Sequence, residues 1–381
     1  MFDLTPEQQD IKQAAREFAE KEFTDIAREL DDNERFDDRL WQKAGELGFL
    51  GVFVEEKYGG AGLGHFEQCL ISEEFARVDT GIAQVMVAAY FGTQLIKLFG
   101  TEEQKLKYLP PVCAGEWRCG MASTEPDAGS DVAGITTTAV RDGDEYVISG
   151  NKMFITNANV GKFLVVLCVT DPKNPKRHDR FSTIIVETDR PGYEASKLHG
   201  KLSIRCSDTG EVAFKDVRVP KENLVGVEGK GFYQLMHFFN RARIDVAGLG
   251  VGTAQGALEK AIDHVKKRKA FGGPLASLQM VQAKIADMAT SVELGRSLLY
   301  RAAKAVDRGD IDPALIAMAK WYTCEVAVKV ADEAIQLHGG YGILKEYNVE
   351  HYWRDAKVLE IFEGTKEVEK VLIGRHLLGR F

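Results

Sequence analysis

The sequence predicts an α+β protein of three domains: an N-terminal α-helical domain, a middle β-barrel domain and a C-terminal four-helix bundle. At 381 residues the chain is too long for one ordinary core, since a domain usually holds ~100–200 residues. Strand-like runs separated by turn residues fill only the middle of the chain, and helical spacing of apolar residues dominates both ends. We therefore expect domains at residues 1–120, 121–230 and 231–381.

The first part is predicted to be helical. Thr5-Pro6-Glu7-Gln8 combines a capping-box pattern with proline at the first helical position, and apolar residues follow at helical spacing from Ile11 to Ala19. Further helices are expected over residues 40–48, 66–77 and 82–99. The glycine-rich segment Tyr58–Gly64 interrupts this pattern and is expected to be a loop.

Short strands are predicted from about Met121 onward. The strand-like runs cover residues 145–148, 152–156, 163–169, 183–187, 211–214 and 217–219. Asp142-Gly143 is a turn signal, and Ser149-Gly150-Asn151 is expected to be another turn. Several short strands with regular turns are typical of a small β barrel or sandwich.

Helical spacing returns at about Gly231 and continues to the end. Leu258, Ile262 and Val265 share one predicted helix face, and residues 314–337 form an alanine-rich, nearly uninterrupted stretch. Three or four long helices of this kind usually pack as a bundle.

Composition excludes several classes of function. The net charge of −8 argues against binding to nucleic acid, which needs a basic surface. The eight histidines form no metal-binding motif, so no metal site is expected. The six cysteines are scattered without C-x-x-C spacing, which predicts reduced thiols. We recognise no leader peptide, and no apolar run comes near the ~18 residues needed to span a membrane. A cytoplasmic enzyme is therefore expected.

A nicotinamide site is not expected, although glycine is plentiful. The run Gly248–Gly252 lacks the third glycine of G-x-G-x-x-G because Thr253 stands there, and no strand precedes it. These glycines are predicted to lie at close contacts between helices.

Two segments could carry chemistry. Thr124–Asp131 is rich in turn residues and could cradle a polar ring edge or a phosphate, but an ordinary turn fits it equally. Glu363 follows Ile361 and Phe362 and precedes Gly364, so it could be a base whose pKa apolar surroundings raise. The residues alone leave open that Glu363 is a surface glutamate before a helix cap at Thr365.

Several motifs together resemble the acyl-CoA dehydrogenases over the whole chain. The first family signature matches Ser123–Gly134, and the second matches Gln336–Gly342, Arg354–Lys357 and Phe362–Thr365. Lys152–Thr156 and Arg268–Gly272 lie between them, in the family's order. The resemblance implies a FAD-dependent enzyme that desaturates an acyl-CoA thioester between Cα and Cβ, with Glu363 as catalytic base. It also implies electron-transfer flavoprotein as the electron acceptor.

The resemblance also implies roles for other residues. The isoalloxazine ring would be bound by Met121, Ser123, Thr124, Gly129, Ser130, Phe154, Ile155 and Thr156. The pyrophosphate and adenine end of FAD, from a neighbouring subunit, would be bound by Arg268, Phe271, Gln279, Gln336, Gly339 and Gly340. Thr365 and Glu367 would contact the cofactor near the base loop. The CoA thioester would be faced by Ser130, Asn240, Arg243, Gly364 and Arg375. Sharing a cofactor between subunits implies a homotetramer built from two dimers.

Three positions depart from the family pattern. Ser123 replaces an aliphatic residue, and Asn240 and Glu367 replace an aspartate and a glutamine of the medium-chain enzymes, which puts individual contacts in doubt. Ala83 stands where glutaryl-CoA enzymes carry an arginine, so a neutral acyl group, short to medium or cyclic, is expected. Ala242 stands where some relatives place the base, which leaves Glu363.

Three other functions fit these residues less well. Acyl-CoA oxidases usually carry an additional C-terminal domain, which is not recognised here, and nitroalkane oxidases tend to have aspartate as the base. A helical scaffold without enzymatic activity would bind no FAD.

Overall fold

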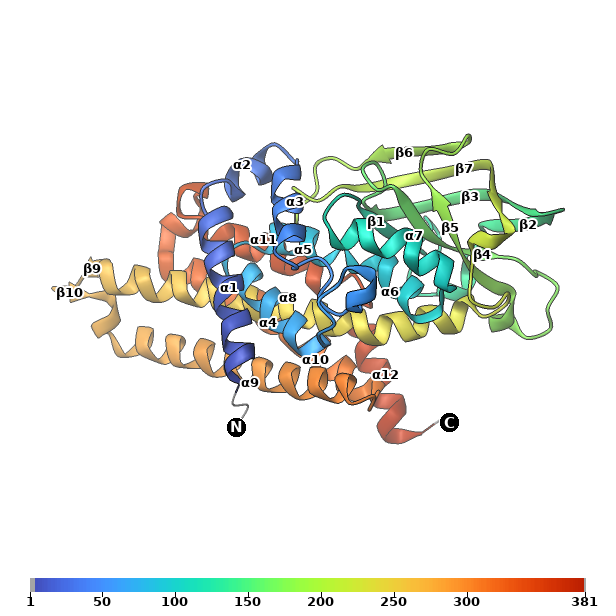
Figure 1. Ribbon diagram of the computed structural model, residues 1–381. Helices are drawn as coiled ribbons and strands as arrows, with labels where there is room; N and C mark the ends of the chain where they lie inside the picture. Colours follow the sequence, from blue (N-terminus) through green and yellow to red (C-terminus); the bar gives the residue numbers. More distant parts are fainter. Residues whose placement is uncertain (1–3, 380–381) are drawn as a thin grey trace.

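The protein consists of helices at both ends of the chain and a β sheet between them. The computed structural model describes residues 4–379. Figure 1 shows the N-terminal helices in blue to cyan, the sheet in green at one end of the molecule, and long C-terminal helices in yellow to red. The predicted fold class, with its order of helical, β and helical parts, is confirmed. The exact domain boundaries stay a prediction.

The described N-terminal part, which begins at Leu4, contains seven α-helices. They are α1 (Pro6–Glu22), α2 (Ala27–Asp32), α3 (Asp38–Glu46), α4 (His65–Val78), α5 (Thr80–Val87), α6 (Tyr90–Phe99) and α7 (Glu102–Cys113). The predicted cap of the first helix is confirmed: the Thr5 hydroxyl accepts from Gln8 N at 3.2 Å, and Gln8 Oε1 accepts from Thr5 N at 3.1 Å. The glycine-rich segment ending at Gly64 leads into α4 as a loop, as predicted.

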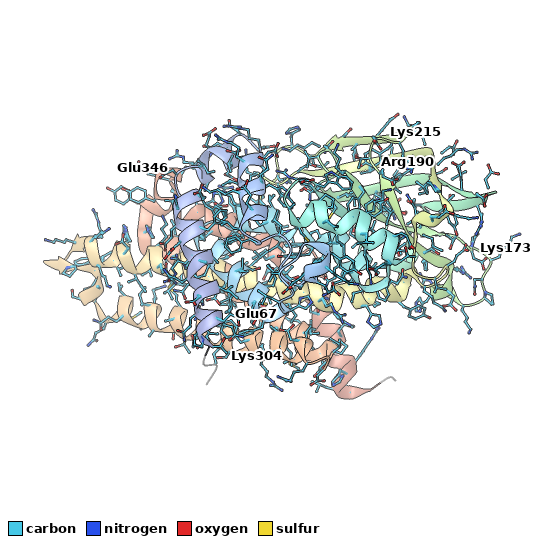
Figure 2. The ribbon with its side chains drawn as sticks, viewed as in Figure 1. Glu67, Lys173, Arg190, Lys215, Lys304 and Glu346 are labelled. Carbon is cyan, nitrogen blue, oxygen red and sulfur yellow. The ribbon has the colours of Figure 1, made fainter. Side chains whose placement is uncertain are left out.

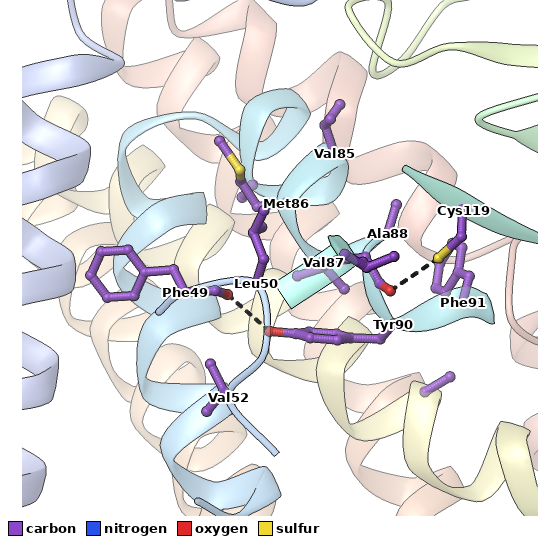
Figure 3. Packing of buried hydrophobic residues seen from close by; sticks show 14 of the residues in the cluster. Phe49, Leu50, Val52, Val85, Met86, Val87, Ala88, Tyr90, Phe91 and Cys119 are labelled. Carbon is purple, nitrogen blue, oxygen red and sulfur yellow. Dashed lines mark hydrogen bonds between the residues drawn. The ribbon is translucent and has the colours of Figure 1, made fainter. Parts of the chain in front are cut away.

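The apolar segment Thr80–Phe99 differs from its prediction in two ways. It is two helices rather than one, because the chain bends at Ala88 and Ala89, which are not helix-breaking residues and gave no signal. By length and composition this segment could also cross a membrane, so the expectation that no such run exists was wrong. Most of it lies inside the protein, where Val87, Ala88 and Tyr90 pack in the largest core cluster (Figure 3).

Eight strands form one curled sheet. They are β1 (Cys119–Ala122), β2 (Thr138–Asp142), β3 (Glu145–Thr156), β4 (Phe163–Val169), β5 (Phe181–Glu187), β6 (Tyr193–Lys197), β7 (Thr209–Pro220) and β8 (Leu224–Val225). Their order is β6-β7-β3-β2-β4-β5-β8, and β1 pairs in parallel with β4. Successive residues of β4 are buried in two different cores, Phe163 against the helices and Leu164 against the rest of the sheet. A strand buried on both faces explains the continuous apolar run in the sequence.

The turn predicted at Ser149–Asn151 is wrong. Strand β3 continues through these residues, and the pairing with β7 shifts register between Ile148 and Gly150. Gly150 has φ 147°, and a Cβ there would lie 2.6 Å from Thr137 Oγ1. The glycine therefore marks a β-bulge and a close approach of two strands rather than a chain reversal. The predicted break between 214 and 217 is likewise absent, since β7 is continuous.

The C-terminal part, described as far as Gly379, contains five α-helices and a small hairpin. They are α8 (Gly231–Lys267), β9 (Lys269–Ala270), β10 (Gly273–Pro274), α9 (Gln279–Asp307), α10 (Pro313–His338), α11 (Glu350–Leu359) and α12 (Lys366–Leu378). Helices α8, α9 and α10 run side by side (Figure 1). A Cβ on Gly252 of α8 would lie 2.2 Å from the Glu73 carbonyl oxygen of α4. The glycine run is thus a helix contact, as predicted.

A buried ionic cluster joins α2, α5 and α11 to the β domain. His351 Nε2 lies 3.0 Å from Asp355 Oδ2 and 3.4 Å from Asp79 Oδ2, and its Nδ1 lies 3.9 Å from Asp31 Oδ2. Asp355 Oδ1 also accepts from the backbone of Ile204 at 2.7 Å. Asp31, His351 and Asp355 have the residue types of a metal site, which sequence spacing did not predict. Burial alone would lower the pKa of His351, but the three carboxylates raise it to about 10, so the imidazolium supplies the positive charge.

Candidate active site

Glu363 lies in the loop between α11 and α12. It adopts φ 54°, and Gly364 follows with φ 104°, so two successive residues are in the left-handed region. A non-glycine residue held there costs about 1–3 kcal/mol and marks functional sites more often than ordinary loops. The Oε2 atom of Glu363 is buried and has no hydrogen-bond partner among residues 4–379. An uncommitted, buried carboxylate oxygen is what a general base requires.

Burial raises the pKa of the Glu363 carboxyl to about 7. Arg243 and Lys320 act in the opposite direction, while Asp245 and Glu369 add to the increase. A pKa near the working pH gives a base that is substantially ionised yet still accepts a proton well. Glu363 is half-buried as a residue and its Oε2 atom is buried, which does not fit a fully exposed surface glutamate.

Two cations hold the main chain of this loop. Arg243 Nε donates to the Glu363 carbonyl oxygen at 3.1 Å, and Lys320 Nζ donates to the Gly364 carbonyl oxygen at 2.5 Å. Thr365 caps α12 by accepting from Val368 N at 3.3 Å, so the predicted helix cap is present. The base loop is therefore fixed from α8, from α10 and by its own following helix.

The residues predicted to bind the flavin ring lie at the ends of β1 and β3. The backbone of Met153 donates to the Thr124 carbonyl oxygen at 2.9 Å, which brings the loop after β1 beside β3. Side chains of Ser123 and Ile155 are buried, whereas Phe154 is 63% exposed at φ 60°. Met121, Thr124 and Thr156 are half-buried, and Ser130 is exposed. The structure thus places the loop after β1 beside the end of β3, where these residues lie.

A buried ion pair beneath this loop was not predicted as part of the site. Lys152 Nζ, which is fully buried, lies 3.0 Å from Glu125 Oε1 and donates to the Ser123 carbonyl oxygen at 2.9 Å. Burial acts to raise the pKa of Glu125, but Lys152 and hydrogen bonds from Thr136 and Thr137 lower it to about 2. The available sequence signal was Lys152, which directly precedes the apolar residues Met153, Phe154 and Ile155. The pair fixes the loop that carries Thr124.

A second group of predicted residues lies far from the first. Arg268, Gln336, Gly339 and Gly340 line a cavity of about 430 Å³ with His264, His338 and Tyr341. Beyond it, Phe271 in the turn of the β9–β10 hairpin is 92% exposed at φ 50°, and Gln279, the first residue of α9, is exposed. The hairpin lies at the end of the molecule opposite the β domain (Figure 1). Figure 2 likewise separates Glu346, two positions after Leu344 of the cavity lining, from Lys215 and Arg190 of the β domain. One chain does not bring the two groups together.

The remaining residues predicted to contact the cofactor or the CoA thioester lie on α8, on α12 and in the loop before α12. Asn240 is half-buried on α8, and Glu367 and Arg375 are exposed on α12. Arg243 is buried and forms an ion pair with Glu369 Oε1 at 2.9 Å, a partner that the sequence did not suggest. Ala83 and Ala242 are buried. Arg243 and Gly364 are therefore next to the base, whereas Arg375 lies near the end of the last helix.

Three family models cover almost the whole chain. The N-terminal, middle and C-terminal domains of acyl-CoA dehydrogenase match residues 5–116, 120–217 and 229–378. The chain belongs to the acyl-CoA dehydrogenase family. The family consists of FAD-dependent oxidoreductases, so this acyl-CoA dehydrogenase is a flavoprotein enzyme, as the motifs implied.

Two curated relatives have similar length and are about equally close to this acyl-CoA dehydrogenase. The probable acyl-CoA dehydrogenase YngJ of Bacillus subtilis (strain 168) is 40% identical over 99% of each chain. The short-chain specific acyl-CoA dehydrogenase of Clostridium acetobutylicum is 41% identical over 98% of each chain.

Solved structures agree with the fold. A chain in the structure of the electron transferring flavoprotein of Acidaminococcus fermentans has a TM-score of 0.97, 40% identity and full coverage of both chains. Butyryl-CoA dehydrogenase from Megasphaera elsdenii has a TM-score of 0.96 and 38% identity, over 99% of this chain and all of that one. A glutaryl-CoA dehydrogenase from Mycobacterium smegmatis in complex with FADH2 has a TM-score of 0.94 and 30% identity, over 99% and 96%.

The residues of this acyl-CoA dehydrogenase fit FAD. Phe154 exposes a large aromatic ring in a strained conformation, which offers a face to a flat ring system. The distant cavity combines Arg268, which has a fixed positive charge, with the Tyr341 ring 5.5 Å away. Burial lowers the pKa of both His264 and His338 in its lining, so Arg268 is its constant cation. The exposed ring of Phe154 suits the flat ring system of FAD, and the cavity with Arg268 suits its phosphates.

Proposed function

We propose that the enzyme desaturates a neutral short-chain, medium-chain or cyclic acyl-CoA between Cα and Cβ, with Glu363 as the base. The observation that carries this proposal is the buried, unpartnered Glu363 Oε2 on a strained loop, in a carboxyl group whose pKa is about 7. A thioester α-proton is weakly acidic, so its removal needs a positioned base of this strength.

Other residues of the chain would position the base, bind FAD and bind the CoA thioester. Glu363 takes the α-proton, and the contacts from Arg243 and Lys320 to its loop keep the carboxylate in place. Bound FAD supplies the acceptor for the β-hydrogen, which leaves as hydride. Thr124, Ser130, Phe154 and Thr156 would hold the ring, while Gln336, Gly339 and Gly340 would contact the far end of a partner's cofactor with Arg268. Asn240 and Arg375 would face the CoA thioester.

The acyl group is proposed to be uncharged. Ala83, Val87 and Ala88 of the α5 region are buried and apolar, so an acyl carboxylate would meet no cation from this segment. An unpaired buried carboxylate would cost several kcal/mol. The short-chain specificity and butyryl-CoA named for two relatives support the same class.

An activity screen tests this assignment. Flavin bleaching would be followed anaerobically with butyryl-, hexanoyl-, cyclohexanecarboxyl- and glutaryl-CoA. We expect the fastest turnover with one of the three neutral thioesters. Faster turnover of glutaryl-CoA than of all three would refute the neutral acyl group, and no bleaching with any acyl-CoA would refute the reaction.

Electron-transfer flavoprotein is the proposed electron acceptor, and the cytoplasm is the proposed location. The similarity to a chain from the Acidaminococcus fermentans flavoprotein structure supports this acceptor. Under this proposal, the enzyme's reduced flavin reacts faster with electron-transfer flavoprotein than with oxygen, which distinguishes the enzyme from an acyl-CoA oxidase.

Assembly as a homotetramer of two dimers is also proposed. The separation of the two groups of FAD-binding candidates supports it, because Arg268 and Phe271 of one chain would complete the cofactor site of another. We expect sedimentation to give a tetramer, and Arg268→Ala to lose FAD more readily at equal protein concentration. A stable monomer that retains a full complement of FAD would contradict this arrangement.

A further inference from the structure

A second buried carboxylate lies six positions after the base. Glu369, on the first turns of α12, is fully buried, and its Oε1 lies 2.9 Å from Arg243 Nε. Arg243 is itself buried, with 8% of its side chain exposed. A buried ion pair is costly to form, since both charges lose their water, so its presence beside the base calls for an explanation.

Arg243 connects Glu369 to the base. The Arg243 Nε–H group donates to the Glu363 carbonyl oxygen at 3.1 Å, and the contact of Nε with Glu369 Oε1 is an ion pair in which Oε1 accepts no hydrogen bond among residues 4–379. A Cβ on Gly364 would lie only 2.1 Å from Glu369 Oε1 and 3.1 Å from Arg243 Nη2. The main chain that carries the base therefore packs directly on the ion pair, and Gly364 has φ 104°, a conformation that favours glycine.

Charged groups reach Glu363 from three helices. Helix α8 contributes Arg243 and Asp245, α10 contributes Lys320, and α12 contributes Glu369. Burial also raises the pKa of Glu369 to about 7, so its charge forms over the same pH range as that of the base. These four groups are two cations, Arg243 and Lys320, and two anions, Asp245 and Glu369. Without Glu369, Asp245 would be the one anion of the four that remains beside Glu363. Nearby cations favour the ionised carboxylate and make it a weaker base.

We propose that Glu369 is a positioning residue for the base: it holds Arg243 against the Glu363 main chain and offsets the guanidinium charge, so that the neighbouring cations do not weaken Glu363. This inference rests on the proposed function of Glu363. A carboxylate that only anchors α12 would affect stability and leave the pH dependence of the reaction unchanged.

The variant Glu369→Gln keeps the size of the side chain and removes its charge. Flavin reduction by butyryl-CoA would be measured by anaerobic stopped flow from pH 5.5 to pH 9. We expect the acid limb of the rate profile to move to lower pH by about 1 unit, and the limiting rate at high pH to fall, because the base is weaker. An acid limb that stays in place in the FAD-loaded variant overturns the proposal.

A second substitution tests the charge balance. Lys320→Gln, added to Glu369→Gln, removes one cation and restores the net charge of the cluster. We expect the acid limb to return toward its original pH. A double variant whose limb stays at the lower pH, or moves further down, would overturn the electrostatic part of the proposal.

If Glu369→Gln does not bind FAD, Glu369→Asp provides a second test. It keeps the charge but shortens the reach to Arg243. We expect an unchanged acid limb with a reduced limiting rate, whereas a fully retained rate would overturn the positioning role.

Glu363→Gln, measured in parallel, separates this inference from the function. If that variant is inactive and the limb of Glu369→Gln does not move, only the role of Glu369 fails; if it is active, the proposed base fails.

Discussion

Replacing Glu363 by glutamine is expected to slow flavin reduction by butyryl-CoA about 10²–10⁴-fold, the usual contribution of a positioned general base. The amide matches the carboxylate in size but does not accept the α-proton. The loop contacts from Arg243 and Lys320 go to main-chain oxygens, so they persist in the variant. The rate constant for anaerobic bleaching of the flavin absorbance measures the effect.

Glu211→Gln is a matched control, since Glu211 is exposed on β7 in the β domain. It is expected to reduce its flavin at the original rate. FAD content and the thermal midpoint of both variants should equal those of the unmodified enzyme. A Glu363→Gln protein with normal FAD content and a reduction rate within a few-fold of the original would place the base elsewhere.

Replacing His351 by glutamine is expected to lower the free energy of unfolding by about 3–5 kcal/mol, the usual effect of removing one partner of a buried ionic cluster. The substitution leaves Asp31, Asp79 and Asp355 buried without the imidazolium between them. These residues join α2, α5 and α11, and Asp355 also binds the backbone of Ile204, so the loss affects contacts between parts of the fold. Denaturant unfolding at fixed protein and FAD concentration measures it.

The effect of His351 should depend on pH in a defined direction. Its pKa is about 10 in the folded protein, against ~6.5 for an unperturbed histidine. The stabilisation is therefore fully present below about pH 6.5 and is lost as the pH rises through 10. The difference in the free energy of unfolding between the original protein and His351→Gln should therefore shrink from pH 7 to pH 10. Burial raises the pKa of Asp79 to about 6, so this range lies above the pKa of that carboxyl.

His199→Gln provides the comparison, because His199 is 73% exposed. A surface substitution of this kind is expected to change stability by less than about 0.5 kcal/mol. Equal stabilities of His351→Gln and His199→Gln at pH 7 would show that the cluster does not stabilise the fold through its imidazolium.

Local sequence signals predicted most of the fold where they report on local geometry. The Thr5 cap and the apolar run of β4 are examples, since capping residues and continuous apolar residues have direct structural meanings. Gly150 misled the prediction because glycine serves both turns and bulges, and only the partner strand distinguishes them. The bend at Ala88 and Ala89 was missed because alanine gives no sign of a helix end.

The candidate site was predictable to a smaller extent. Glu363 could be named from its motif, but its strained φ and its buried Oε2 atom, which has no hydrogen-bond partner among residues 4–379, are properties of the folded loop. Glu369 and Lys320 gave no signal, because they reach the loop from α12 and α10 and their charges resemble those of ordinary surface residues. The separation of Arg268 from the flavin-ring residues is likewise a consequence of topology, which spacing along the chain does not reveal.

Exchange of the substrate α-proton tests the central claim most directly, because it reports proton removal without the redox step. Butyryl-CoA would be incubated with the unmodified enzyme and with Glu363→Gln in deuterated buffer, and deuterium at Cα would be followed by NMR. We predict exchange with the unmodified enzyme and a loss in Glu363→Gln that parallels the loss of flavin reduction. Exchange by Glu363→Gln at the original rate would contradict the assignment of Glu363 as the base.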